Sequence, residues 1–305
     1  MLETFFGSTT MASALRLAIP LMFVAIGGCF SDRAGVFNIA LESFMLCAAF
    51  FAALGTYFTV NPYVGVLFGI LAGLACSLIF GLFVFHLGAS GIVVSIAMNL
   101  SAWGLTTLLM MLFWGVRGSF VDDRLVSLPT LRAGWLEEIP YIGKIFNGQN
   151  ILVYLGLILI VVMWFVMYKT QFGLRLRGVG MNAHAAQTIG VNTRRYRWIA
   201  TLITGVFSGI GGAVLPLGGT SIFSENMTAG RGFLAVAALL VAKGNPLLTG
   251  LFCLLFAYTD AVSLGLQNIG IPSQLVETLP YVTTILVLVI TGIRQKLSLR
   301  MKRAD

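Results

Sequence analysis

The sequence predicts an all-α polytopic membrane protein with about nine transmembrane helices, within a range of roughly eight to ten. Of its 305 residues, 58% are hydrophobic and only 10% are charged, whereas roughly a quarter of the residues of a globular domain are charged. Apolar runs of about 20 residues recur along the whole chain, and a run of that length spans a bilayer as a helix. Strand-like alternation is absent, so we expect residues 1–305 to form one helical membrane domain embedded in the lipid bilayer.

Nine apolar segments follow one another along the chain. They cover 14–30, 39–59, 64–86, 90–114, 151–168, 198–218, 229–243, 246–266 and 279–293. Segment 229–243 is the weakest span, because its length as a helix is about 22 Å against a hydrocarbon core of about 30 Å. It follows a glycine-rich stretch at 209–221, and segment 39–59 likewise follows a break at 31–35.

The distribution of charge predicts the topology. Segments 169–197 and 294–305 hold eleven of the nineteen Lys and Arg residues, whereas loop 115–150 carries four basic and four acidic residues. Because Lys and Arg accumulate on the cytoplasmic side, we expect both basic segments and the C-terminus to be cytoplasmic and loop 115–150 to be external. An odd number of spans puts the N-terminus outside, and one missed or re-entrant segment would reverse that. The net charge of +8 thus reflects topology and does not indicate nucleic acid.

The two breaks resemble each other. Ile-Gly-Gly precedes each of them, at 26–28 and 210–212, and the motifs RAGVFNIALE and AGRGFLAVAA follow. In the expected topology these motifs start at opposite membrane faces, which predicts an inverted repeat with halves of roughly 14–114 and 198–293. Interrupted segments at matching places in two halves point to a substrate site. Chance similarity between glycine-rich helices is the alternative.

Polar side chains inside the apolar segments are candidates for lining a translocation path. Asn38 and Glu42 share one helix face, and a carboxylate in lipid costs a few kcal/mol, so Glu42 has to face protein or water. The alternative role for Glu42 is a bridge between helices, for which Arg231 is a candidate partner. Asp260 has no basic residue within a turn or two, so its partner comes from another helix or from water. Asn99 forms an i,i+4 polar pair with Ser95, for which helix–helix hydrogen bonding is the other explanation.

The second break adds further candidates. A helix that begins near Thr228 would aim free N–H groups and a partial positive charge at the site, beside Arg231. Phe37 and Phe233 stand close after a glycine of their motifs and could stack on a heteroaromatic ligand, worth about 0.5–1.5 kcal/mol. With 23 phenylalanines in the chain, ordinary packing is the alternative. The candidate path residues are therefore Phe37, Asn38, Glu42, Asn99, Arg231, Phe233 and Asp260.

The basic segment 169–197 encodes a short helix of its own. Asn182 is a suitable N-cap, the stretch AHAAQTI favours a helix, and Gly190 fits the position just beyond its end. We expect Gly173, Gly178 and Gly180 to form a bent approach to it. Such a helix of small residues suits docking into a groove on a partner, and a plain positive-inside anchor is the alternative. The candidate docking residues are Asn182, Ala183, His184, Ala185, Ala186, Gln187, Thr188, Ile189 and Gly190.

The chain offers no candidate catalytic or metal site. Its four cysteines lie in apolar segments without metal-ligand spacing, and the two histidines are isolated from each other. No G-x-x-x-x-G-K-[ST] motif occurs, and no serine or cysteine nucleophile is paired with a histidine. We therefore expect neither an NTPase nor a hydrolase.

Four motifs in collinear order resemble those of permease subunits of ATP-binding-cassette (ABC) importers of the nucleoside type, within the group that also imports branched-chain amino acids and ribose-like sugars. SDRAGVFNIALESFML resembles the signature (E/D)RAGVxNIxLEGxM of that type. FGLRLRGVGMNAHAAQTIGVNTRRYR resembles the group's cytoplasmic coupling loop, and TAGRGFLAVAALLVAKGNP resembles its second membrane motif. The stretch 259–289 resembles the C-terminal pattern of the nucleoside branch.

This sequence departs from the family's pattern at several positions. Ser43 replaces the usual glycine, and Ala183-His184 stands where the coupling loop usually has Asn-Pro. Val262 and Gly265 replace leucines of the C-terminal pattern. The GIDLSVG motif of the sugar branch is absent. Nucleosides or purines are therefore the first expectation for the solute, riboflavin the second and branched-chain amino acids the third.

The resemblance implies a multi-pass permease of the bacterial cytoplasmic (inner) membrane that binds several partners. It would pair with a second permease, in a heterodimer, and a cytoplasmic ATPase would hold the ATP and Mg²⁺ and bind the coupling loops. An extracytoplasmic substrate-binding protein or lipoprotein would deliver solute to loop 115–150. A self-sufficient channel or secondary carrier would also explain Glu42 and Asp260, but it would leave the capped basic helix unused.

Overall fold

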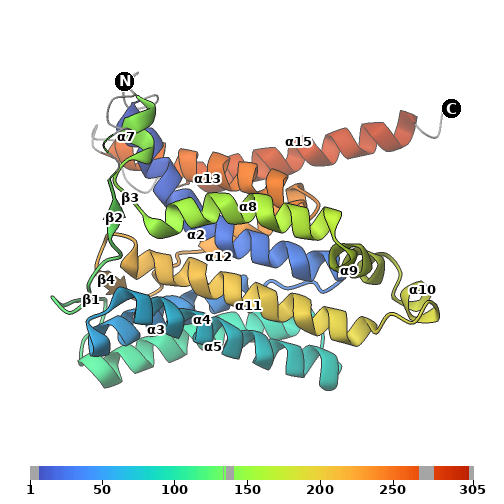
Figure 1. Cartoon of the computed structure of the whole chain (residues 1–305), viewed down its shortest axis with the longest axis horizontal. Coiled ribbons are helices and arrows are strands. Elements are labelled where there is room, and N and C mark those ends of the chain that lie inside the picture. Colours follow the sequence, from blue (N-terminus) through green and yellow to red (C-terminus); the bar gives the residue numbers. More distant parts are fainter. Residues whose placement is uncertain (1–6, 133, 135–140, 268–277, 302–305) are drawn as a thin grey trace.

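The computed structural model describes residues 7–132, 134, 141–267 and 278–301, which form a bundle of helices running in a similar direction (Figure 1). Among these residues, seven helices are long and apolar enough to cross a membrane. They are α2 (Ser8–Arg33), α3 (Leu41–Thr59), α4 (Pro62–Gly81) with its π-helical extension η1 (Leu82–His86), α5 (Gly91–Trp114), α8 (Ile151–Lys169), α11 (Thr193–Leu217) and α13 (Pro246–Gln267). Two further apolar helices are shorter, α12 (Arg231–Val241) and residues 279–290 of α15 (Leu279–Met301). Each of the nine predicted segments overlaps one of these helices, which confirms the predicted fold class.

The centre of the bundle is formed by α2 and α3. In each of them 83% of the membrane-spanning window is buried, against 28% for α4 with η1, 22% for α5 and 28% for α8. The outward faces of α4, α5 and α8 are apolar, with side chains such as Leu71, Leu108 and Val161 exposed. Apolar side chains on the outside suit contact with lipid or with another membrane subunit.

Helix α11 packs against α2, α3 and α4 through glycines. A Cβ atom added at Gly73 of α4 would overlap the carbonyl oxygen of Gly205 and lie 2.9 Å from the Cα atom of Gly209. A Cβ atom at Gly212 would overlap the carbonyl oxygen of Met45 in α3. Small residues let helix backbones approach closely, which stabilises packing where the hydrophobic effect between helices is weak.

The two breaks lie close to the predicted positions but not at them. The first comprises residues 34–40, between α2 and α3, and the second comprises 218–230, between α11 and α12. The expectation of a break at 209–221 is wrong for its first half, because α11 stays helical to Leu217. Gly209 and Gly212 lie inside the helix since they are needed for close packing and not for a bend.

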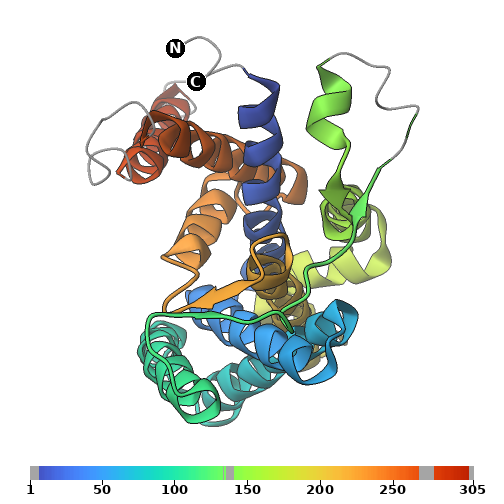
Figure 2. The same cartoon turned by 90° about the vertical axis from the view of Figure 1, so that its left-hand side faces the viewer.

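The two ends of the bundle differ. At one end, β1 (Ser119–Val121) pairs antiparallel with β4 (Ile222–Ser224), β2 (Thr130–Leu131) pairs with β3 (Gln149–Asn150), and α7 (Ile142–Phe146) lies nearby. At the other end lie α9 (Gln171–Met181) and α10 (Ala183–Thr188). Helix α2 begins at the first end, and α15 ends on the side of α9 and α10 (Figures 1 and 2). The described parts of loop 115–150 thus lie at the opposite end from segment 169–197 and the end of α15, as the distribution of charge predicts.

The crossing of α4 and α11 generates a prediction. Gly73→Ala should destabilise the protein by about 1–3 kcal/mol, because the new methyl group overlaps the backbone of α11. The measurement is the thermal midpoint of the purified protein in detergent. Gly104→Ala is the matched control, since a Cβ atom there meets nothing within 4 Å. Equal midpoints for the two variants would contradict the crossing geometry.

Candidate functional site at the helix breaks and the basic segment

The first feature of the site is the Glu42 carboxylate, which lies in the first turn of α3 and is 7% exposed. Its Oε1 atom accepts hydrogen bonds from Thr228 Oγ1 at 2.6 Å and from the Gly230 amide at 2.9 Å. Its Oε2 atom accepts one from the Gly232 amide at 2.6 Å. The carboxylate of one broken helix therefore caps the start of the other.

This contact supplies acceptors for the N–H groups at the start of α12 and donors for the buried Glu42 carboxylate. The first N–H groups of a helix lack internal partners and carry a partial positive charge. A hydrogen bond to a charged group contributes about 1.5–3 kcal/mol. A Cβ atom at Gly232 would lie 2.5 Å from the Cα atom of Glu42, so only glycine lets α12 start this close to α3.

Two expectations about this region are wrong. The N–H groups at the start of α12 are not free for a ligand, since Glu42 binds those of Gly230 and Gly232. Among the described residues, the ion pair of Arg231 is with Asp260 and not with Glu42, the Arg231 Nη2 and Asp260 Oδ2 atoms being 3.6 Å apart. Both side chains remain about a quarter to a third exposed, and such pairs contribute little to stability. Of the two sources predicted for a partner of Asp260, another helix or water, the structure shows another helix, since Arg231 belongs to α12 and Asp260 to α13.

The first break is held by α5. Ser95 Oγ accepts a hydrogen bond from the Ile39 amide at 3.1 Å. Asn99 Nδ2 donates to the Ile39 carbonyl at 3.2 Å, and Asn99 Oδ1 accepts from the Ser43 amide at 3.0 Å. The i,i+4 pair thus binds backbone groups of the first break and, at Ser43, of the first turn of α3, which confirms the helix–helix hydrogen bonding considered from the sequence.

Asn38 lies inside the same break and is 7% exposed. Its Oδ1 atom accepts from the Ala40 amide at 2.8 Å, which closes a turn just before α3 begins. Its Nδ2 atom is buried without a hydrogen-bond partner in the described part of the chain. A buried donor without a partner costs about 1–3 kcal/mol, so this amide is available to an acceptor that enters the site.

The second break is held in a related way by α15, where the Tyr281 hydroxyl donates to the Ala229 carbonyl at 2.9 Å. Phe37 and Phe233 are 45% and 46% exposed, each at its own break. Phe37 borders a hollow of about 340 Å³ with the start of α5, and Phe233 lies at the start of α12. Thr228 and Tyr281, which complete the second break, were not among the predicted site residues; the predicted helix start near Thr228 was the only signal for them.

The basic segment folds as predicted around its short helix. Asn182 Oδ1 accepts from the Ala185 amide at 3.0 Å and caps α10. Gly190 has φ +81° just beyond its end, and the Val191 amide donates to the Ala186 carbonyl at 3.0 Å. Asn192 Oδ1 then caps α11 by accepting from the Arg195 amide.

The expected bent approach at Gly173, Gly178 and Gly180 is wrong. These glycines lie inside α9, a continuous helix of 11 residues. Gly173 and Gly180 pack directly against other backbone segments, whereas a Cβ atom at Gly178 would meet nothing within 4 Å. As in α11, glycine at two of these positions permits close approach and does not produce a bend.

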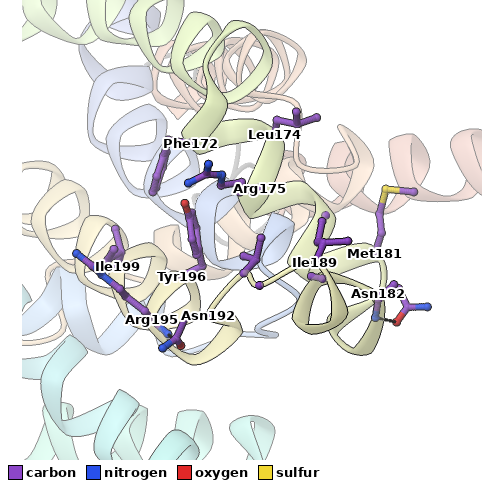
Figure 3. A pocket seen from close by; sticks show the side chains of 15 residues that line it. Phe172, Leu174, Arg175, Met181, Asn182, Ile189, Asn192, Arg195, Tyr196 and Ile199 are labelled. Atoms are coloured by element: carbon purple, nitrogen blue, oxygen red, sulfur yellow. Dashed lines mark hydrogen bonds between the residues drawn. The ribbon is translucent and has the colours of Figure 1, made fainter.

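Helices α9 and α10 and the start of α11 enclose a cavity of about 1140 Å³. Figure 3 shows apolar side chains of its lining, among them Ile189 and Ile199, with the guanidinium groups of Arg175 and Arg195 around them. Ile189 is 79% exposed, and Ala186 on the same helix is buried. An apolar hollow with basic flanks and an exposed apolar rim has the character of a protein-docking surface.

The fold, a bundle of apolar helices with two breaks and a short capped helix at one end, resembles that of a solved transporter. A solved structure described as an inward-facing conformation of a putative metal-chelate type ABC transporter has the same fold, with a TM-score of 0.51 at 16% identity over 92% of this chain and 84% of that one. The chain belongs to the family described as "Branched-chain amino acid transport system / permease component", whose profile matches residues 10–288. It is therefore a membrane-spanning transport subunit of an ABC system.

Several curated proteins are similar over most of their length. The nucleoside ABC transporter permease protein NupC of Lactococcus lactis is 36% identical over 291 residues, which are 91% of this chain and 90% of that protein. The guanosine ABC transporter permease protein NupQ of Bacillus subtilis is 33% identical over 92% and 91%. The putative glucose ABC transporter permease protein TsgC13 of Haloferax volcanii is 30% identical over 95% and 93%.

Removal of the Glu42 carboxylate tests the site. Glu42→Ala should lower the stability of the folded protein by about 3 kcal/mol or more, because at least two buried amides lose their acceptor at roughly 1–3 kcal/mol each. The checking measurement is the thermal midpoint together with the amount of protein in the membrane. Glu225→Ala is the control, since Glu225 Oε1 accepts from the Gly118 amide in an exposed setting. A midpoint for Glu42→Ala as high as that of the control would rule out the capping role.

Proposed function

We propose that this chain forms, together with a second permease subunit, the translocation path of an ABC importer for nucleosides. The observation that carries the proposal is its similarity over more than nine-tenths of the chain to permeases named for nucleosides and for guanosine. The two breaks supply a suitable setting, because irregular backbone inside a membrane protein is tolerated where it is buried in protein or lines a water-filled cavity. The helix halves 14–114 and 198–293 form the inverted repeat around them.

The proposed path residues fall into four groups. Phe37 and Phe233 offer exposed rings on which a base could stack. Asn38 offers a buried amide donor without a partner in the described part of the chain. Glu42 and Asn99 hold the breaks in shape. The partly exposed pair of Arg231 and Asp260 borders the start of α12.

A heterodimer with a second permease is supported by paired relatives. The permeases NupB of L. lactis and NupP of B. subtilis are 23% and 26% identical to this chain, and each comes from the organism of a more similar relative, NupC or NupQ. We assign the more divergent member of such a pair the role of the partner. An extracytoplasmic substrate-binding protein or lipoprotein delivers the solute to the end that carries β1 to β4.

A separate ATPase subunit binds the segment 169–197 in the cytoplasm and holds the ATP and Mg²⁺. Support comes from the rigid caps at Asn182 and Gly190, the exposed Ile189 and the apolar hollow beside α10. The six basic residues of the segment support its assignment to the cytoplasmic face of the inner membrane. The C-terminus lies on the same side.

The solute class is tested by uptake in cells that lack this chain and in cells that express it. Tritiated guanosine, adenosine, riboflavin, leucine and glucose are compared at equal concentration. We expect loss of the chain to abolish guanosine or adenosine uptake and to leave the other three unchanged. Loss of riboflavin, leucine or glucose uptake instead would transfer the proposal to that solute, and uptake without any ATPase subunit would favour a channel or secondary carrier.

Docking of the ATPase is tested at Ile189, which is 79% exposed at the edge of the hollow. Ile189→Asp buries a carboxylate without a partner in the complex, which costs about 1–3 kcal/mol or more, a loss of affinity of roughly 5- to 150-fold or greater. We expect the ATPase to co-purify poorly and uptake to fall while the permease still inserts. Val60→Asp is the matched control, because Val60 is also an exposed apolar residue but lies at the far end of α3. Full co-purification of the ATPase with Ile189→Asp would refute the docking site.

A further inference from the structure

The segment that precedes α10 touches the first break backbone to backbone. A Cβ atom added at Gly180, the penultimate residue of α9, would overlap the Arg33 carbonyl oxygen and lie 3.0 Å from the Gly35 nitrogen. From the other side, a Cβ atom at Gly35 would lie 3.2 Å from the Gly180 Cα atom. Gly35 has φ +73°, a conformation that favours glycine. No side chain lies between these two backbone segments, so a shift of one segment cannot be absorbed by a change of side-chain rotamer.

Helix α9 is fixed firmly in its place. Its Leu176 and Val179 side chains are buried. The Arg177 guanidinium lies 4.7 Å above the ring of Tyr168, whose hydroxyl accepts a hydrogen bond from Arg33 Nη2 at 3.0 Å. The last residue of α2 and a residue of α9 thus contact the same tyrosine, so the contact between Gly180 and Gly35 lies between elements that are also joined through Tyr168.

Helix α9 is also joined closely to α10. Asn182 is both the last flanking residue of α9 and the N-cap of α10. A single residue therefore separates the surface that we assign to the ATPase from the helix that touches the break. We call residues 171–190, which contain α9, Asn182 and α10, the coupling segment.

Beyond Gly35, the break leads to the other elements of the site within a few residues. Ile39 binds Ser95 and Asn99 of α5 through its backbone, and Glu42 binds the start of α12. A displacement of Gly35 would therefore reach both helix breaks through contacts that are each made with backbone atoms. Close-packed interiors transmit such strain.

We propose that the contact between Gly180 and Gly35 transmits movement of the coupling segment to the start of α3 and, through Glu42, to the start of α12. This inference rests on the proposed docking of the ATPase at α10. It assigns Gly180 a positioning role in transport, although Gly180 borders neither the ATPase surface nor the path.

The test uses two helical glycines. Gly180→Ala introduces a methyl group into the contact, and Gly104→Ala introduces the same group in α5, away from the coupling segment, where nothing lies within 4 Å. Both variants are studied in the complete complex of permeases, ATPase and substrate-binding protein in vesicles. We expect Gly180→Ala to keep the ATPase bound and hydrolysing ATP but to reduce solute uptake per ATP by about tenfold, within the usual range of coupling between sites. Gly104→Ala should match the wild type.

An unchanged ratio of uptake to ATP hydrolysis in Gly180→Ala would overturn the inference. If Ile189→Asp loses the ATPase in the same assay, only the transmission contact has failed; if Ile189→Asp retains the ATPase, the docking proposal itself has failed. If the Gly180→Ala protein does not accumulate in the membrane, amide hydrogen exchange of the wild-type complex tests the inference instead. We expect ATP with vanadate to change the exchange of residues 34–40 together with that of the coupling segment, and unchanged exchange at 34–40 would refute the contact's role.

Discussion

The structure depends most on the contact between the Glu42 carboxylate and the start of α12. A carboxylate within a membrane bundle is costly unless it is fully bonded, and a helix that starts inside a protein lacks acceptors for its first amides. Glu42 and the amides of Gly230 and Gly232 satisfy each other. Because the charge comes from α3 and the amides from α12, neither broken helix can be placed without the other. The remaining contacts of the breaks, from Asn99 and Tyr281, are arranged around this pair.

Much of the fold follows from the sequence, because hydropathy and length alone define a spanning helix. All nine predicted segments contain helices. The positions of the breaks were predicted less well, since glycine has two uses in a membrane helix. At Gly35 and Gly230 it adopts a positive φ, whereas at Gly209, Gly212 and Gly180 it permits close packing inside a helix. A single sequence does not distinguish these uses, because the distinction depends on what lies opposite.

The parts of the site also differ in how well the sequence predicts them. The caps at Asn182 and Gly190 are local, with partners within four residues, and they were predicted. The partners of Glu42 lie 186 to 190 residues away. The sequence indicated that Glu42 needs a partner, and Arg231 was the obvious candidate by charge, yet backbone amides fulfil the role. A comparison of residue types does not register backbone groups. For the same reason hydrogen bonding by Ser95 and Asn99 was predicted, but its backbone partners in residues 39–43 were not.

The shortness of α12 has a consequence for where this subunit can meet lipid. Its 11 residues extend about 16 Å, roughly half of a bilayer's hydrocarbon core. A helix of that length leaves the rest of a crossing to non-helical backbone, whose carbonyl groups hydrocarbon chains cannot solvate, and residues 218–230, which lead into α12, contain no helix. This side of the subunit therefore requires hydration or a protein neighbour. The proposed pairing with a second permease would then serve solvation as well as transport, because it would shield this backbone from lipid.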